Sequence, residues 1–135
     1  MEKLMQKSKN RQELFDNTIN HFNSENRGIE FGTGYIYRTS DGRGCAIGRE
    51  ISDKLAKELD NCSNGDGVAI HNDNQFNKLP IRLKRMGQDF LYGLQLLHDN
   101  DINWDSNGLS DIGMKRAKKI AEKYKLYTSS FEEPF

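Results

Sequence analysis

A cysteine within a glycine-rich segment is the first residue of this sequence that could carry out chemistry. Cys45 lies in the stretch Gly-Arg-Gly-Cys-Ala-Ile-Gly-Arg, residues 42 to 49, between two arginines. Nearby cations favour the thiolate, which is the nucleophilic form of cysteine, but no histidine is close in sequence to act as its base. The arginines also suit phosphates, because a guanidinium group pairs with phosphate oxygens and glycine-rich backbone adds N–H donors. Two interpretations stay open: a reactive or phosphate-binding turn, and a small side chain packed in the core.

A second group of polar residues follows an apolar stretch further along the chain. Gln95 and His98 are three residues apart and therefore project from one side of a helix, and Asp99 comes next. His98 could act as a general base oriented by Asp99, with Cys45 or water as the nucleophile. It could equally be a histidine at a helix C-terminus that bonds the last carbonyls. The catalytic set is incomplete, so enzymatic activity is uncertain and binding without turnover is favoured.

The residues predicted to bind a ligand combine cations, glycines, polar side chains and aromatic rings. Two arginines would hold phosphates, two glycines would allow close backbone approach, and an aromatic ring would stack on a base. The predicted set is Tyr37, Arg43, Gly44, Gly48, Arg49, Gln95, His98 and Trp104. No metal ligands and no cofactor are predicted, because the calcium-like sequence from Asn103 to Gly108 lacks the glutamate that should close such a loop.

The overall charge limits the classes of partner. The 135 residues hold 20 Lys and Arg and 20 Asp and Glu, so the net charge is zero, and general nucleic-acid binding is unlikely. Aspartates concentrate between residues 99 and 111, and lysines follow from 115 to 125. With Arg82, Lys84 and Arg85 these lysines could form a local phosphate-binding patch, or they could be a solvated helix face.

The chain carries no recognisable export or membrane signal. Its first eleven residues are polar and basic with no apolar run behind them, and the longest apolar stretch, residues 90 to 97, is far too short to span a bilayer. Without export, Cys45 and Cys62 are expected to be reduced thiols. These features predict a cytoplasmic protein that does not insert into membranes.

The elements that must position these residues are predominantly helical. Periodicity and capping residues predict helices over residues 11–23, 53–59, 83 or 86 to 98, and 110–125. An Asp-Gly turn between two extended stretches predicts a β-hairpin over residues 34–39 and 44–48. A brief strand is predicted over residues 68–70. Residues 71–80 are expected to be irregular and mobile, and 99–108 a loop. The prediction is one α+β domain over residues 1–135, a hairpin or small antiparallel sheet packed on about four helices, with flexible ends at about 1–9 and 128–135.

Two short sequence motifs, and the order in which they occur along the chain, resemble a known group of proteins. Cys45-Ala46-Ile47-Gly48 is followed by Leu94-Gln95, then Leu97-His98-Asp99, and a last helix contains residues 120 to 124. This resembles small phage and prophage proteins, mostly uncharacterised, that share a Cys-Ala-[Ile/Val]-Gly element and a Leu-Gln-x-x-His-Asp element. The resemblance covers most of residues 11 to 126. The polar insertion at 71–78 and the Gly-Leu-Ser-Asp sequence at 108–111 depart from it.

The resemblance implies an accessory protein in the cytoplasm of an infected bacterium. By analogy with other phage accessory proteins, we expect it to bind and sequester a small phosphorylated nucleotide-like ligand, such as a host anti-phage immune signal. The pocket could lie at the interface of a homo-oligomer. Two alternatives stay open: an enzyme that cleaves such a signal, and an inhibitor that binds a host defence protein.

Overall fold

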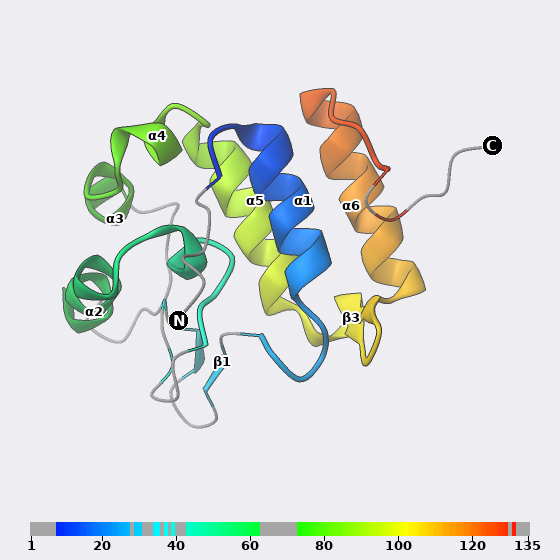
Figure 1. The fold of residues 1–135 in the computed structure, drawn as a ribbon, viewed down its shortest axis with the longest axis horizontal. Helices are drawn as coiled ribbons and strands as arrows, with labels where there is room; N and C mark the ends of the chain where they lie inside the picture. Colours follow the sequence, from blue (N-terminus) through cyan, green and yellow to red (C-terminus); the bar gives the residue numbers. More distant parts are fainter. Residues whose placement is uncertain are drawn as a thin grey trace, which may run out of the picture.

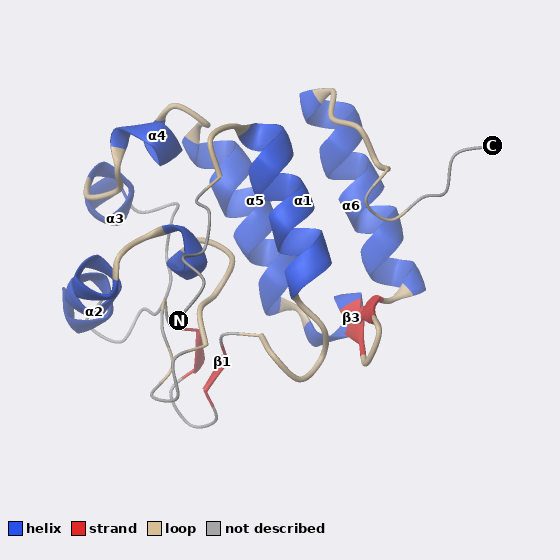
Figure 2. Cartoon of the chain, in the orientation of Figure 1, coloured by secondary structure: helices blue, strands red, loops and turns tan. Residues whose placement is uncertain are grey.

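The structure is a computed structural model and describes residues 8–27, 29–30, 34–35, 37, 39, 43–62, 73–129 and 131 (Figure 1). Helices predominate in this part of the chain, and the strands are short (Figure 2). The helices are α1 (Arg11–His21), α2 (Asp53–Cys62), α3 (Asp73–Asn77), α4 (Ile81–Lys84), α5 (Gln88–Asp99) and α6 (Asp111–Tyr124), with 3-10 turns η1 (Gly48–Glu50) and η2 (Asp101–Asn103). Strands β1 (Ile29–Glu30) and β2 (Gly34–Tyr35) form one antiparallel pair, and β3 (Trp104–Asp105) and β4 (Gly108–Leu109) form another. The predicted α+β class is confirmed.

The core lies where α1, α5 and α6 run side by side (Figure 1). The predicted stripe of Met86, Phe90, Leu94 and Leu97 is buried, which confirms the apolar face assigned to this part of the chain. The small residues of α6 are also buried, whereas Ile120 and Tyr124 are only partly buried against the core. Small residues on α6 allow its backbone to approach the rest of the core closely.

Local capping residues set the helix starts as predicted. The Asn10 side chain accepts a hydrogen bond from the Glu13 N–H at 2.9 Å at the start of α1. Ser110 Oγ accepts one from the Gly113 N–H at 3.1 Å at the start of α6. Each side-chain oxygen satisfies an N–H group that has no partner within its own helix. Lys125 then ends α6 in the left-handed conformation, with φ of 57°.

The predicted hairpin forms only in part. Thr39 N–H donates to the Arg43 carbonyl at 2.8 Å, and Cys45 N–H donates to the Tyr37 carbonyl at 3.2 Å, as expected for facing strands. The extended segment then stops, because the backbone turns at residues 46–47 into η1. A Cβ atom on Gly48 would lie 1.9 Å from the Tyr37 carbonyl oxygen, so only glycine allows this turn to fold back on the preceding strand.

The prediction of an irregular segment over residues 71–80 is wrong for its described part. Residues 73–77 form α3, and α4 follows directly after Pro80. The helix predicted from residue 83 or 86 to 98 is present as α5, but it begins only at Gln88, because Gly87 has φ of 96° and separates α5 from α4. A residue with a side chain adopts that backbone conformation only with strain. The change of direction at Gly87 therefore depends on glycine.

The prediction of a loop over residues 99–108 is wrong as well. η2 is followed by the hairpin of β3 and β4, in which Trp104 pairs with Leu109. The Ser110 N–H donates to the Asn103 carbonyl at 2.8 Å and closes the hairpin onto α6. Short alternating strands of two residues carry no periodicity that a sequence pattern could detect.

Both end segments contain a residue that contacts the rest of the fold. Ser8 donates from its N–H and its hydroxyl to the buried Glu50 carboxylate, at 2.7 and 2.9 Å. The Phe131 ring packs against Phe15 with centroids 6.1 Å apart. The predicted strand at 68–70 and the remaining end residues, 1–7 and 132–135, lie outside the described residues. None of the helices in the described ranges combines the length and apolar character needed to cross a bilayer.

Candidate functional site

Cys45 lies in the core and not at an open surface. Its side chain has no exposed area, and its sulfur accepts a hydrogen bond from the Gly48 N–H at 3.2 Å. Burial raises the pKa of the Cys45 thiol to about 12. The thiol is therefore protonated at neutral pH, and the arginines beside it in sequence do not activate it as a nucleophile.

The two elements behind the resemblance contact each other. The Ile47 N–H, in the turn after Cys45, donates to Gln95 Oε1 at 3.4 Å. The amide nitrogen of Gln95 in turn donates to Asp99 Oδ1 at 2.8 Å. Gln95 thus joins the turn to α5 by satisfying a buried backbone N–H, which explains a glutamine at this position without a ligand.

His98 is fully buried beside Asp99. Its Nδ1 lies 2.8 Å from Asp99 Oδ1, and because a carboxylate only accepts, Nδ1 carries the proton. Burial lowers the pKa of the His98 imidazole, and the hydrogen bond to Asp99 opposes that shift. Its ring also meets the edge of Phe22, with centroids 4.7 Å apart. The arrangement has the geometry of an oriented base, but the described residues leave the ring no exposed area for substrate.

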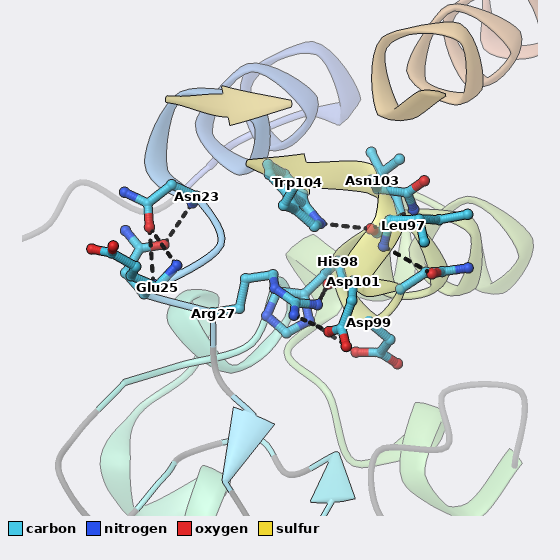
Figure 3. Close-up of polar contacts among 12 residues, drawn as sticks. Asn23, Glu25, Arg27, Leu97, His98, Asp99, Asp101, Asn103 and Trp104 are labelled. Atoms are coloured by element: carbon cyan, nitrogen blue, oxygen red, sulfur yellow. Dashed lines mark hydrogen bonds and ion pairs between the residues drawn. The ribbon is translucent and has the colours of Figure 1, made fainter. Parts of the chain in front are cut away.

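Arg27 is a central member of this polar cluster that the sequence did not reveal. One guanidinium nitrogen donates to the His98 carbonyl at 2.8 Å, and another bonds the Asp101 carboxylate (Figure 3). The Arg27 side chain is 8% exposed, whereas Asp101 is 84% exposed. Arg27 stands alone after a polar loop, so no spacing or motif pointed to it. It connects that loop to the C-terminal end of α5.

Trp104 is held in the same region by its indole nitrogen. Its Nε1 donates to the Leu97 carbonyl at 2.9 Å, and the Asn103 side chain donates to the same carbonyl at 3.0 Å (Figure 3). Both groups satisfy a carbonyl in the last turn of α5 that lacks a partner within the helix. The ring is 5% exposed and meets Phe22, so it packs in the core.

The remaining predicted residues have intramolecular partners. The buried Tyr37 hydroxyl donates to Gln75, and burial raises its pKa. Arg43 donates to the Arg27 carbonyl at 3.1 Å. The Arg49 guanidinium lies 5.7 Å from the Phe22 ring centroid, and burial lowers its pKa.

The two glycines predicted to approach a ligand instead approach the protein. The close contact of Gly48 with the Tyr37 carbonyl is one case, and a Cβ on Gly44 would lie 2.9 Å from Arg49 Cγ. The structure therefore brings several predicted residues together around Phe22 as a packed polar core. Their role in ligand binding stays a prediction, and it requires the core to open.

Two open cavities lie elsewhere in the described part of the chain. The larger is a groove of about 920 Å³ between α5, η2 and α6, and Gln95 and Asp99 are the predicted residues that line it. The smaller is a pocket of about 610 Å³ at the start of α1 and beside α4. We call it the basic pocket, because four of its seven lining residues are cations: Lys9, Arg11, Arg82 and Arg85, with Asn10, Gln12 and Met86.

Two cations of the basic pocket are fixed by the fold. Arg11 Nε donates to the Met86 carbonyl at 2.7 Å, and its guanidinium lies 4.9 Å from the Tyr124 ring centroid. Arg82 pairs with the Glu50 carboxylate at 2.9 Å and also donates to the Ser8 carbonyl at 2.7 Å. These contacts hold both guanidinium groups in place before any ligand arrives.

The other two cations, Lys9 and Arg85, are exposed. Neither forms an ion pair within the described ranges. α1 also begins here, and the first turn of a helix presents N–H groups and a partial positive charge. The pocket therefore concentrates positive charge, and Glu50, outside its lining, is the carboxylate that the described ion pairs place against one of its cations. Sequence reasoning included Arg82 and Arg85 in a basic patch but grouped them with the lysines of α6, and it missed Lys9 and Arg11.

Comparisons with known proteins do not add a functional assignment. No family model, no curated protein and no solved structure matches the chain. The function is therefore argued from the geometry of this fold.

Proposed function

We propose that this protein binds a small phosphorylated, nucleotide-like ligand in the basic pocket and sequesters it without turnover. The observation that carries the proposal is the gathering of four cations in one cavity at the start of α1, with one of them paired to a carboxylate. Guanidinium and ammonium groups around a helix N-terminus form a favourable environment for phosphate oxygens. In the infected bacterium that the resemblance implies, the ligand would be a host immune signal.

An exposed aromatic ring beside the pocket suits the base of such a ligand. The Tyr127 N–H donates to Gln12 Oε1 at 2.8 Å, and the Gln12 side chain returns a bond to the Tyr127 carbonyl at 3.1 Å. The Tyr127 residue is 78% exposed. The Tyr127 backbone is thus held next to Gln12 of the basic pocket, and its exposed ring would offer a stacking face for the base.

Binding without turnover is favoured over catalysis by the state of the candidate catalytic groups. Cys45 and His98 have no exposed area, and burial disfavours both the thiolate and the imidazolium. Neither residue lines the basic pocket. A ligand in that pocket would therefore not meet these groups.

Calorimetric titration tests the proposal with a panel of defined ligands: pyrophosphate, ADP, ADP-ribose and cyclic dinucleotides. At least one nucleotide should bind at micromolar concentration, and its affinity should fall as salt rises, because the contacts are charged. The variant K9A/R85A should bind at least about tenfold more weakly, since one charged hydrogen bond contributes about 1.5 kcal/mol or more. Both side chains are exposed and form no ion pair with the residues that the structure describes, so the variant should fold normally.

The matched control removes two exposed lysines outside the basic pocket. K54A/K57A loses the same charge from α2, outside both cavities, and should bind like the unmodified protein. If K54A/K57A loses affinity and K9A/R85A does not, the pocket assignment is wrong. If no member of the panel binds at micromolar concentration, the proposed function is wrong. Heat denaturation of the complex should release intact ligand, and release of fragments would establish the enzymatic alternative instead.

A further inference from the structure

The larger groove has an apolar character that the basic pocket lacks. Leu96 on α5 and Ile102 on η2 both line it and are 50% and 51% exposed. Ile112 lies one turn before Arg116 on α6 and is 47% exposed. Large apolar side chains gathered in one area, rather than scattered singly, are typical of surfaces that bind another protein.

Charges of opposite sign line the two sides of this groove. Asp99 and Asp101 lie at the end of α5 and the start of η2, and Arg116 and Lys119 lie on α6. Asp99 is only 14% exposed, whereas Asp101 stays 84% exposed although it pairs with Arg27, so Asp101 is the acid that another molecule can reach. Arg116 donates to Asn103 Oδ1 at 2.9 Å, which fixes its guanidinium at the edge. The groove thus has an acidic edge, an apolar floor and a basic edge.

We propose that this groove is the interface of a homodimer, with a second copy of the chain as its occupant. In a two-fold dimer the same patch occurs on both copies, so the patch must be complementary to itself. An acidic edge facing a basic edge across an apolar floor meets that requirement, because the acidic edge of each copy meets the basic edge of the other. The chain has zero net charge, so no general repulsion opposes the approach of two copies.

The interface goes beyond the proposed ligand binding and does not depend on it. The basic pocket and the groove share no lining residue. The groove begins at Tyr92 on α5, about 9 Å along the chain's helical rise from Met86 of the basic pocket. A dimer through the groove leaves the basic pocket open, so failure of one proposal is distinguishable from failure of the other.

Sedimentation velocity of the full chain over a concentration series tests the dimer. The unmodified protein should sediment as a dimer at tens of micromolar. L96E should be monomeric at the same concentration, because it places a charge in the apolar floor. The control I81E carries the same type of change at a residue that is 60% exposed and outside the groove, and it should stay dimeric.

Charge reversal tests the complementarity of the two edges. K119E should raise the dimer dissociation constant at least tenfold, and added salt should weaken the unmodified dimer. A dimer that persists in both L96E and K119E would overturn the proposal, as would equal dissociation of L96E and I81E. An unmodified protein that is monomeric throughout the series would also overturn it and leave the groove to a different protein.

Discussion

The contact between α6 and η2 leads to a prediction about two glycines. A Cβ atom on Gly113 would lie 2.1 Å from the Asn103 carbonyl oxygen and 2.8 Å from its carbon. Real Cβ atoms keep more than about 3 Å from such atoms, and backbone cannot move aside as a flexible side chain can. The variant G113A must therefore push α6 away from η2. Gly93, on α5, has no atom within 4 Å of an added Cβ and provides the matched control.

The expected effects have opposite signs. Overpacking costs about 3 kcal/mol when backbone must shift, and the better helix propensity of alanine returns at most about 1 kcal/mol. G113A should therefore lower the free energy of unfolding by about 2 kcal/mol. G93A meets no clash and should raise it by about 0.5 kcal/mol. The change at Gly113 also strains the Ser110 N–H to Asn103 carbonyl bond, which is 2.8 Å long.

Urea unfolding followed by circular dichroism measures both variants. With unchanged slopes, the midpoint of G113A should move to lower urea and that of G93A to slightly higher urea. The thermal midpoint of G113A should fall by about 8 °C for a chain of this size. If G113A is as stable as the unmodified protein, the close approach of α6 to η2 is incorrect. If G113A and G93A lost the same free energy of unfolding, the cost would come from replacing a glycine within a helix and not from the clash with Asn103.

Three further predictions concern a buried thiol, a buried carboxylate and two histidines. In a C62S background, Cys45 should react with a thiol reagent at pH 8 only on the timescale of unfolding, because burial raises the pKa of its thiol to about 12. Rapid labelling of the native protein would contradict the burial of Cys45. E50Q should lower the free energy of unfolding by about 2 kcal/mol, since charged hydrogen bonds become neutral ones; an unchanged urea midpoint would show that these bonds contribute nothing. His21 keeps an exposed side, but partial desolvation and the neighbouring Arg49 and His98 lower its pKa to about 4. Burial also lowers the pKa of His98, so the unfolded state binds more protons below pH 6.5. Stability should therefore be full above pH 6.5 and decrease on acidification toward pH 4, less steeply in H21Q; a pH-independent midpoint between pH 7 and 5 would refute this.

The helix starts could be predicted because their causes are local. Asn10 bonds the N–H of a residue three positions on, and Ser110 does the same. Such a bond depends on residue types within one turn, which a sequence pattern contains. The buried stripe of Phe90 and Leu94 follows from helical periodicity for the same reason.

The break at Gly87 and the hairpin after η2 could not be predicted in this way. A glycine within a helical pattern is compatible with both a continuous helix and a turn, and tertiary packing selects φ of 96° here. The hairpin of β3 and β4 is stabilised by contacts of β4 with α1 and α6 and by the Asn103 carbonyl. Their formation depends on residues outside their own segment.

The candidate site also combines features that residue types predict with features that only tertiary packing sets. Arg43, Arg49 and Cys45 adjoin glycines in sequence, and from residue types alone they suit a phosphate or a reactive thiol. Whether such groups face solvent depends on what packs over them, and in this fold Cys45 is fully buried. Residue type sets what a side chain can do, and burial sets whether it can do it.

Residue types and their spacing were enough to predict the four longer helices, the main apolar faces, the zero net charge and the cations suited to phosphate. Tertiary structure decided where those cations gather. Lys9 and Arg11 come from the start of the chain and Arg82 and Arg85 from its middle, and the fold brings them to one pocket. Capping and periodicity act over one or two turns, whereas a pocket forms only when packing of the whole core joins segments that are distant in the chain.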